Sequence, residues 1–206
     1  MTAAVVVAGG SSRRMGGVDK LALDVGGRPL LDRVLAAARP VCRALVVVGP
    51  VRPTSVAGVS FTNEAPAEAG GGPVPAVAAG LDALAGSGAM AVEGTVLVLA
   101  GDLPLLAPRH LRRLVATMGD GPAAAAVDDR GRAHPLVAAY RAGVLRARLA
   151  ALGPPWAGVA AARLLPSDGG LATVDLGADA VRNVNDADDL ARARALLARP
   201  GRSLAR

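Results

Sequence analysis

This chain of 206 residues is poor in cysteine, in aromatic residues and in long apolar runs. Its one cysteine, Cys42, excludes an internal disulfide and a metal cluster built on thiolates. Phe61, Tyr140 and Trp156 are the only aromatic residues, so a core must be built from alanine, valine and leucine. No apolar run reaches the ~18 residues that cross a bilayer, and no basic-then-apolar signal segment precedes the first apolar run. We therefore expect a protein of the cytoplasm that has no membrane partner.

Lysine is almost absent, although basic residues outnumber acidic ones by 23 to 17 and the formal net charge is +6. Lys20 is the only lysine, and all other basic residues are arginines. The arginines are scattered, and few aromatic side chains are present on which nucleobases stack. We expect no nucleic-acid partner, and a nucleic-acid-binding module is the weakest alternative. The positive balance suits an anionic small-molecule substrate, which it attracts over distance.

The opening stretch, residues 3–20, is the most informative part of the chain. It begins with a valine-rich run long enough for one strand and continues into a loop with four glycines, Arg13, Arg14 and Lys20. Glycine lets backbone N–H groups approach a ligand closely, and the cations supply countercharge, so the loop suits phosphate oxygens. The spacing is neither that of a P-loop nor Gly-x-Gly-x-x-Gly. A solvated connection between a strand and a helix is the alternative.

Apolar runs of strand length alternate with amphipathic stretches along the rest of the chain. Strands are predicted at 3–8, 44–48, 56–61, 95–100, 123–127, from 133 and at 171–176, an extended piece at 21–25, and helices at 29–39, 73–84, 108–118, 142–152, 155–165 and after 186 to about 198. Strands separated by helices predict a parallel sheet, because a parallel crossover needs room for a helix. We predict one α/β domain over residues 1–198, a three-layer αβα sandwich with a predominantly parallel, Rossmann-like sheet. Residues 199–206 are expected to form a flexible tail.

A carboxylate follows the strand predicted at 95–100, in the segment Gly101-Asp102-Leu103-Pro104. Ligands of parallel sheets sit outside the carboxyl ends of the strands, so Asp102 and the glycine-rich loop should lie at one edge. A carboxylate that faces phosphate needs a cation between them, and Mg²⁺ prefers one or two carboxylates with phosphate oxygens and water. Asp102 is therefore a predicted magnesium ligand. An aspartate that caps a turn before Pro104 is the alternative.

The opening stretch resembles the signature of the nucleotidyltransferases related to molybdenum cofactor guanylyltransferase, and the resemblance returns at four later points. It is carried by Ala8-Gly9-Gly10-x-Ser12-x-Arg14-Met15-Gly16-x-x-Asp19-Lys20. The resemblance implies a sheet of the nucleotide-diphospho-sugar transferase type, a loop that holds a triphosphate, and magnesium on Asp102. It implies that the loop residues that bind the nucleotide are Val7, Ala8, Gly9, Gly10, Ser12, Gly16 and Lys20. It further implies that Lys20, Arg14 and Asp102 form the catalytic set.

The segment before the second predicted helix concerns the choice of base. In the family, an acidic residue and a Gly-Pro-Leu-Ala-Gly element read the base and ribose. Gly72-Pro73-Val74 fits this element, whereas Pro75-Ala76 replaces the expected Ala-Gly. Glu64 is the preferred acidic candidate and Glu68 the other. A plain linker is the alternative for residues 70–72, and the base stays open between guanine and cytosine.

One histidine and two asparagines complete the resemblance. His134-Pro135-Leu136 matches an element near the pterin-phosphate acceptor, so His134 is expected to contact that anion; a role in closing the strand is the alternative. Asn183 and Asn185 match an Asn-x-Asn that in the family reaches back to the metal and the acceptor, which makes Asn185 a second magnesium ligand. The alternative is an ordinary helix N-cap at Asn185 or Asp186.

The activity that the resemblance implies is transfer of GMP from GTP to the terminal phosphate of (molybdenum-)molybdopterin, with Mg²⁺ as cofactor and pyrophosphate as second product. GTP and molybdopterin are then the partners of a monomer or weak oligomer that contacts cofactor-insertion or acceptor proteins transiently. A phosphate monoester is largely dianionic near neutral pH, its second pKa being about 6, so no general base is required. The alternatives are cytidylyl transfer, another phosphorylated acceptor, and a nucleotide-binding protein without turnover.

Overall fold

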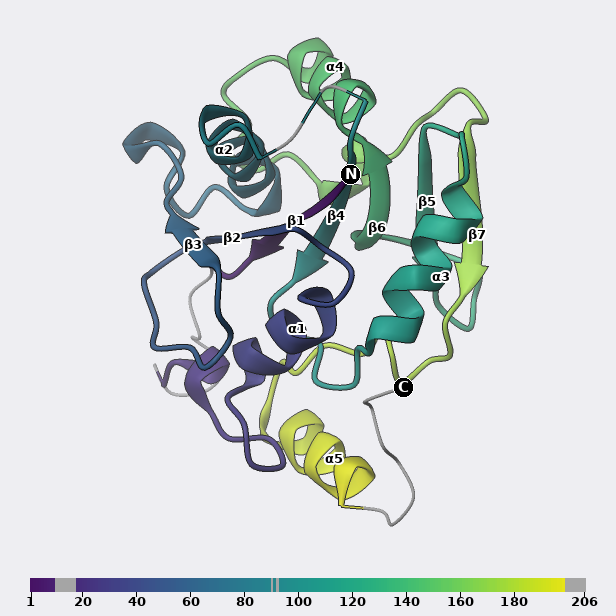
Figure 1. The fold of residues 1–206 in the computed structure, drawn as a ribbon. Coiled ribbons are helices and arrows are strands. Elements are labelled where there is room, and N and C mark those ends of the chain that lie inside the picture. Colours follow the sequence, from purple (N-terminus) through teal and green to yellow (C-terminus); the bar gives the residue numbers. More distant parts are fainter. Residues whose placement is uncertain (10–17, 90, 92, 199–206) are drawn as a thin grey trace.

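Seven strands of the described chain form one sheet, in the order β3-β2-β1-β4-β6-β5-β7, in this computed structural model (Figure 1). The strands are β1 (Thr2–Val7), β2 (Ala44–Val48), β3 (Val59–Thr62), β4 (Thr95–Ala100), β5 (Ala123–Val127), β6 (Ala133–Arg141) and β7 (Leu171–Asp175). All pairings are parallel except those of β6 with β4 and β5. The structure describes residues 1–9, 18–89, 91 and 93–198, and the tail predicted at 199–206 lies outside them. The predominantly parallel sheet is confirmed.

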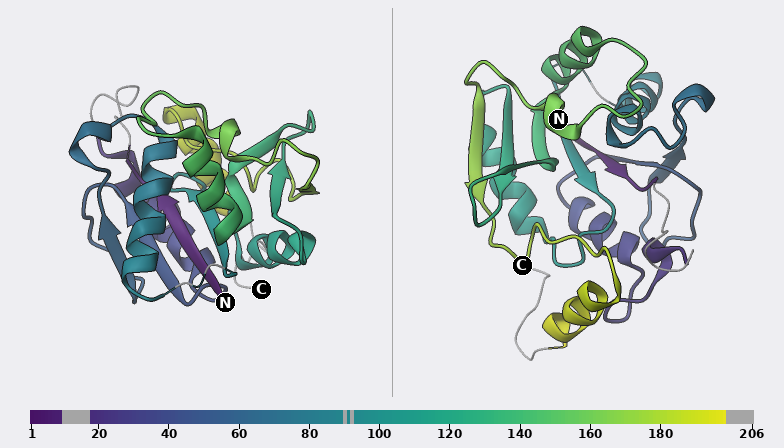
Figure 2. Two further views of the ribbon diagram at one scale, coloured as in Figure 1. Left: turned by 90° about the horizontal axis from the view of Figure 1, so that it is seen from above. Right: turned by 180° about the vertical axis from the view of Figure 1, so that it is seen from behind.

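Helices of the described residues cover both faces of this sheet. One face carries α1 (Leu30–Ala38), α3 (Pro108–Met118) and α5 (Ala187–Leu197), and the other carries α2 (Pro73–Gly86) and α4 (Ala142–Leu152). Figure 1 shows α2 and α4 above the sheet and the other three below it, and Figure 2 shows the same layers from above and from behind. Side chains of β1 alternate between the two hydrophobic cores, as a strand buried on both faces requires. The three-layer αβα sandwich is confirmed.

The core is built mainly of alanine, valine and leucine, and it packs closely where a small residue permits it. A Cβ atom added to Gly80 of α2 would lie 2.4 Å from Cγ1 of Val5, so this glycine lets α2 rest directly on β1. Tyr140 is fully buried, its hydroxyl donates to Pro135 O at 3.0 Å, and burial raises its pKa. Burial also raises the pKa of Cys42 to about 12, so this thiol stays protonated at neutral pH.

Two predicted elements differ in the structure. Residues 21–25 were expected to be extended. Leu23 is extended and Asp24 forms an isolated β-bridge with Pro29, but residues 20–22 form a 3₁₀ turn (η2, Lys20–Ala22), which the Asp19 side chain caps by accepting from Leu21 N. Residues 155–165 were expected to be helical, but only the 3₁₀ turn η4 (Ala161–Leu164) forms. Gly158 interrupts the segment at φ +78°, and its N–H donates to Gly71 O at 2.7 Å rather than to a helical carbonyl.

The carboxyl ends of the parallel strands share one edge, where the connections to the following elements lie. The segment after β7 crosses back along this edge to β4, where Val184 N donates to Asp102 O at 3.0 Å. Residues from the beginning, middle and end of the chain therefore meet at this edge, where open parallel sheets bind their ligands. None of the helices in the described ranges combines the length and the apolar character that a membrane span requires.

Candidate active site

A cavity of about 290 Å³ opens at the carboxyl edge of β1 and β4. Its walls include eight of the residues that the sequence nominates: Val7, Ala8, Gly9, Lys20, Glu64, Gly72, Asp102 and Asn183. His134 and Asn185 do not line it. The nominated residues Gly10, Ser12, Arg14 and Gly16 lie outside the described residues. Residues up to 176 positions apart thus share one cavity.

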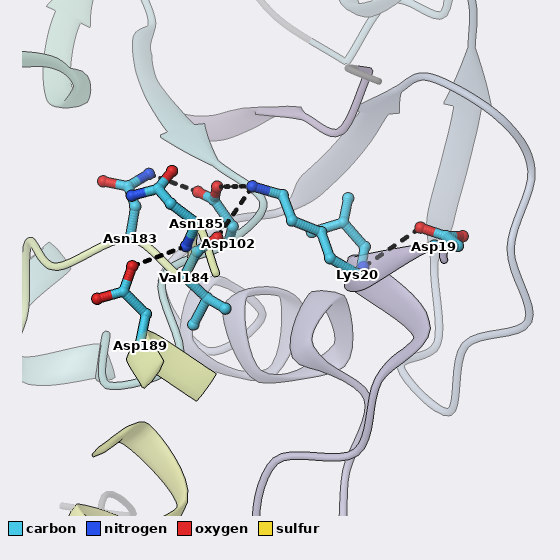
Figure 3. A network of polar contacts seen from close by, with 8 residues as sticks. Asp19, Lys20, Asp102, Asn183, Val184, Asn185 and Asp189 are labelled. Atoms are coloured by element: carbon cyan, nitrogen blue, oxygen red, sulfur yellow. Dashed lines mark hydrogen bonds and ion pairs between the residues drawn. The ribbon is translucent and has the colours of Figure 1, made fainter. Parts of the chain in front are cut away.

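Asp102 is the centre of a polar network in this cavity (Figure 3). Lys20 Nζ donates to Asp102 Oδ2 at 2.6 Å and to Val184 O at 3.0 Å. Asn183 Nδ2 donates to the other carboxylate oxygen, Oδ1, at 2.5 Å. Figure 3 shows the ammonium and the amide approaching the carboxylate from opposite sides. The carboxylate is therefore held in a fixed orientation by contacts that span most of the chain.

The contact between Lys20 and Asp102 is only partly shielded from water, since their side chains are 24% and 13% exposed. Both charged groups can therefore be reached by a ligand. A phosphate oxygen on the ammonium and a cation on the carboxylate would replace the ion pair without leaving either charge unpaired. The pair is suited to receive an anion together with a metal ion.

The donor set fits a magnesium ion that arrives with phosphate. Among the described residues, no group of three His, Cys, Asp or Glu side chains is placed to hold a metal ion by itself. Mg²⁺ usually takes one or two carboxylates and completes its shell with substrate phosphates and water, so Asp102 is a sufficient protein anchor. Asn185, nominated as second ligand, is exposed, and its backbone N–H donates to Asp189 Oδ2 at 2.9 Å. Figure 3 shows its side-chain amide beside that of Asn183.

Glu64 forms another wall of the cavity. Its Oε2 accepts from Gly70 N at 3.1 Å, which fixes the carboxylate across the loop that precedes α2. A Cβ added to Gly9 would lie 3.3 Å from Glu64 Oε1, so glycine at position 9 leaves room for this side chain. Gly72 lies just before α2 with φ +105°, a backbone conformation that favours glycine.

Glu68, the other acidic candidate, does not line the cavity. It is 9% exposed, its Oε1 accepts from Trp156 N at 2.9 Å, and within the described structure its Oε2 has no hydrogen-bond partner. It therefore ties the loop before α2 to the segment around Trp156. The geometry favours Glu64 over Glu68 for contact with a ligand in the cavity.

His134 lies on β6, the strand beside β4, whereas the cavity opens at the ends of β1 and β4. It pairs with Ala126 of β5, and its Nε2 is buried with no partner among the described residues. Leu136, two positions further along the strand, lines the cavity instead. The structure thus places the His134 segment next to the site, with a leucine and not the imidazole in the lining.

Arg52 lines the cavity and was not nominated from the sequence. Its guanidinium bonds to both oxygens of Asp19, with Nε to Oδ2 at 2.7 Å and Nη2 to Oδ1 at 3.2 Å. The hydrogen bond from Arg52 lowers the pKa of Asp19 below its ordinary value. Its position in the sequence was the available signal: Arg52 follows the carboxyl end of β2, which lies at the same edge of the sheet as the carboxyl end of β1.

Solved structures share this fold. The molybdopterin-guanine dinucleotide biosynthesis protein A of Archaeoglobus fulgidus superposes with a TM-score of 0.68 at 22% identity, covering 95% of this chain and 98% of that one. The 2-C-methyl-D-erythritol 4-phosphate cytidylyltransferase of Thermus thermophilus superposes with a TM-score of 0.66 at 23% identity, covering 96% and 99%. At such identities the likeness concerns the fold alone.

Sequence comparisons are more specific. The molybdenum cofactor guanylyltransferase of Rhodobacter capsulatus is 34% identical over 194 residues, which cover 93% of this chain and 94% of that protein. That of Acidiphilium cryptum (strain JF-5) is 37% identical over 139 residues, which cover 66% of this chain and 65% of the relative's length. The family model of the MobA-like NTP transferase domain matches residues 4–166, which is most of the chain. The chain belongs to the MobA-like NTP transferase family.

Proposed function

We propose that this protein transfers GMP from GTP to the terminal phosphate of molybdopterin and releases pyrophosphate. The observation that carries the proposal is the 2.6 Å contact between Lys20 Nζ and Asp102 Oδ2 on the wall of one cavity. An ammonium and a carboxylate side by side are what a triphosphate and its magnesium ion need. The names of the guanylyltransferase relatives support guanine as the base and the pterin as the acceptor.

The reaction exchanges one phosphorus–oxygen bond for another. An oxygen of the acceptor's terminal phosphate forms a bond to the α-phosphorus of GTP, while the bond from that phosphorus to the bridging oxygen of the β-phosphate breaks. Pyrophosphate leaves with the bonding electron pair. The attacking phosphate is already largely dianionic near neutral pH, its second pKa being about 6, so no proton has to be removed. Catalysis then depends on positioning and on neutralising charge.

The residues of the cavity supply these two effects. Lys20 offsets the negative charge that grows on the leaving pyrophosphate. Asp102 would hold Mg²⁺, which neutralises triphosphate oxygens when bound, and Asn183 keeps one carboxylate oxygen oriented through its 2.5 Å hydrogen bond. We expect the protein to act as a monomer or weak oligomer. A reaction that consumes GTP needs a compartment that supplies it, and we place the protein in the cytoplasm.

Glu64 is the residue that we expect to read the base. Guanine carries N–H donors at N1 and N2 on one edge, and a carboxylate accepts two such hydrogen bonds side by side. Cytosine offers one exocyclic amino donor next to an acceptor nitrogen, which pairs poorly with a carboxylate. The position of Glu64 on the cavity wall therefore supports guanine.

Cytidylyl transfer is the second candidate, because one feature of the chain departs from the pattern that reads the base in the family. The first four residues of α2 are Pro73, Val74, Pro75 and Ala76, so only Val74 and Ala76 carry an N–H there. This end of the helix offers fewer donors to a ligand than the family's Ala-Gly pattern does. The shared fold with a cytidylyltransferase is compatible with either base.

The test is pyrophosphate release measured with each of the four nucleoside triphosphates, with and without molybdopterin. We expect release only with GTP and molybdopterin together, and only with Mg²⁺. Release with CTP in place of GTP would replace guanylyl by cytidylyl transfer. Binding of a triphosphate without release under any condition would indicate a nucleotide-binding protein without turnover.

A further inference from the structure

Arg52 joins the two ends of the glycine-rich segment, residues 9–18. Its side chain is only 11% exposed, and Nη1 donates to Ala8 O at 3.3 Å and to Pro50 O at 3.1 Å. Its Nε and Nη2 donate to the two carboxylate oxygens of Asp19 at 2.7 and 3.2 Å. Ala8 directly precedes the segment and Asp19 directly follows it, so one guanidinium holds both ends.

Asp19 passes this constraint on to Lys20. The same oxygen that accepts from Arg52 Nη2, Oδ1, also accepts from Leu21 N at 3.2 Å and so caps the 3₁₀ turn Lys20–Ala22. The ammonium at the first residue of that turn reaches Asp102 Oδ2 at 2.6 Å. Hydrogen bonds therefore connect Arg52 through Asp19 to the backbone of the turn that carries Lys20.

We propose that Arg52 is a positioning residue. Its hydrogen bonds link Ala8 to Asp19, an arrangement that we call the staple, and thereby fix the turn that directs the Lys20 ammonium into the cavity. The inference rests on the proposed function for the role of Lys20 in turnover, but the placement of the ammonium is measurable without turnover.

The geometry separates this role from direct binding of phosphate. A guanidinium has five N–H donors, and four of those of Arg52 are occupied by Ala8, Pro50 and Asp19. The adjacent Asp19 carboxylate also neutralises its charge. Arginine suits such a staple because its planar fork meets both carboxylate oxygens at once, which a lysine ammonium cannot reproduce.

The kinetic test uses Arg52→Met, Arg52→Lys, Asp19→Asn and the double variant Asp19→Asn/Arg52→Met, with whichever triphosphate the wild type turns over. We expect Arg52→Met to lower kcat by about 10- to 100-fold and to change KM by less than about 3-fold, since a misplaced catalytic group loses rate. Arg52→Lys should not restore kcat, and the double variant should be no worse than Arg52→Met alone, because both residues act through one contact. Full kcat in Arg52→Lys, or a loss confined to KM, would instead make Arg52 a phosphate ligand and overturn the proposal.

A matched control comes from the opposite edge of the sheet. Like Arg52, Arg39 links backbone segments: it donates to the carbonyls of Cys42, Arg43 and Gly58, but it lies at the amino end of β1. We expect Arg39→Met to lower the melting temperature about as much as Arg52→Met does, with kcat unchanged. Equal losses of kcat in both variants would reduce Arg52 to a general stabilising residue.

The second readout needs no activity, because Lys20 is the only lysine of the chain. Trace acetylation followed by mass spectrometry reports its reactivity alone, with the α-amino group of Met1 as internal reference. We expect Arg52→Met and Asp19→Asn to raise the acetylation rate of Lys20 several-fold and Arg39→Met to leave it unchanged. An unchanged rate in Arg52→Met would overturn the proposal even if the wild type turned over no triphosphate, whereas a raised rate in such a protein would uphold the staple and reject only the proposed function.

Discussion

Two walls of the cavity are built in different ways. The proposed catalytic wall, defined here as Lys20, Asp102 and Asn183 and called the catalytic wall below, is held by side-chain contacts between residues 81 and 82 positions apart. The base wall, defined as Glu64, Gly70 and Gly72, is held by a hydrogen bond between residues six positions apart. The first wall exists only when the whole sheet is assembled, whereas the second belongs to one loop.

This difference explains where the chain departs from the pattern of its family. Lys20 and Asp102 match the family's motifs, and a change at either would break a contact that joins distant strands. The departures, Pro75-Ala76 and the displaced acidic residue, fall on the base wall or next to it. A local loop can change without disturbing the sheet, so substitutions near the proposed base wall are compatible with intact contacts between Lys20, Asp102 and Asn183.

Among substitutions in the catalytic wall, a change at Asp102 should lower activity the most. Asp102→Ala removes the carboxylate that would anchor magnesium and breaks the ion pair with Lys20. We expect Mg²⁺-dependent pyrophosphate release to fall by about 10³-fold or more, the scale of losing a main electrostatic group. The melting temperature should change little, because the ion pair is partly exposed. Asp82→Ala, at a surface ion pair with Arg146, is the matched control and should keep full activity; full activity in Asp102→Ala would remove the metal assignment.

Removing the ammonium from the same wall should have the next largest effect. We expect Lys20→Ala to lower kcat at saturating GTP by about 10²-fold, because charge accumulates on the leaving pyrophosphate. Steady-state rates over a range of GTP concentrations separate this loss from a change in KM. If turnover at saturation is unchanged, Lys20 only contributes to binding and the description of this wall as catalytic is wrong.

A substitution in the base wall should change the preference between GTP and CTP more than the maximal rate. Glu64→Gln replaces one acceptor oxygen by a donor, which leaves a guanine N–H unpaired, and we expect kcat/KM for GTP to fall by about 10- to 100-fold. Competition between GTP and CTP measures the change in preference. Glu68→Gln is the matched control, since Glu68 is buried beside Trp156, and it should alter stability without altering base preference. The opposite outcome would exchange the roles of the two carboxylates.

The smallest expected effect concerns the staple under the catalytic wall and its dependence on pH. Because the hydrogen bond from Arg52 lowers the pKa of Asp19 below 3.8, its stabilising contribution is complete above that value and is lost as the pH falls through the lowered pKa. Asp19 is 44% exposed, so we expect Asp19→Asn to reduce the free energy of unfolding by less than about 1 kcal/mol at pH 7. Urea unfolding at pH 7 and at a pH below the lowered pKa tests this: the two proteins should converge in acid, and a constant difference would contradict the assignment.

The fold was largely predictable because the residues that end its strands and helices lie next to those elements in the sequence. The bounds of β4 and β5 agree with the predicted strands, and α3 begins at the predicted Pro108, since apolar runs flanked by glycine and proline leave few alternatives. The extended piece predicted at 21–25 was wrong at residues 21–22, because Asp19 caps the turn Lys20–Ala22 with a side chain that no periodicity reveals. Arg52 was not nominated because its distant partners, Ala8 O and the Asp19 carboxylate, are 44 and 33 positions away and meet it only in the folded chain.

The central claim is that Lys20 and Asp102 exchange their mutual contact for a nucleotide and its metal ion. A crystal structure of the protein with GTP and Mg²⁺ tests it most directly. We predict that Mg²⁺ lies on Asp102, that Lys20 Nζ moves from the carboxylate to a phosphate oxygen, and that the guanine edge faces Glu64. A nucleotide bound elsewhere, with the 2.6 Å contact between Lys20 and Asp102 still intact, would contradict the account.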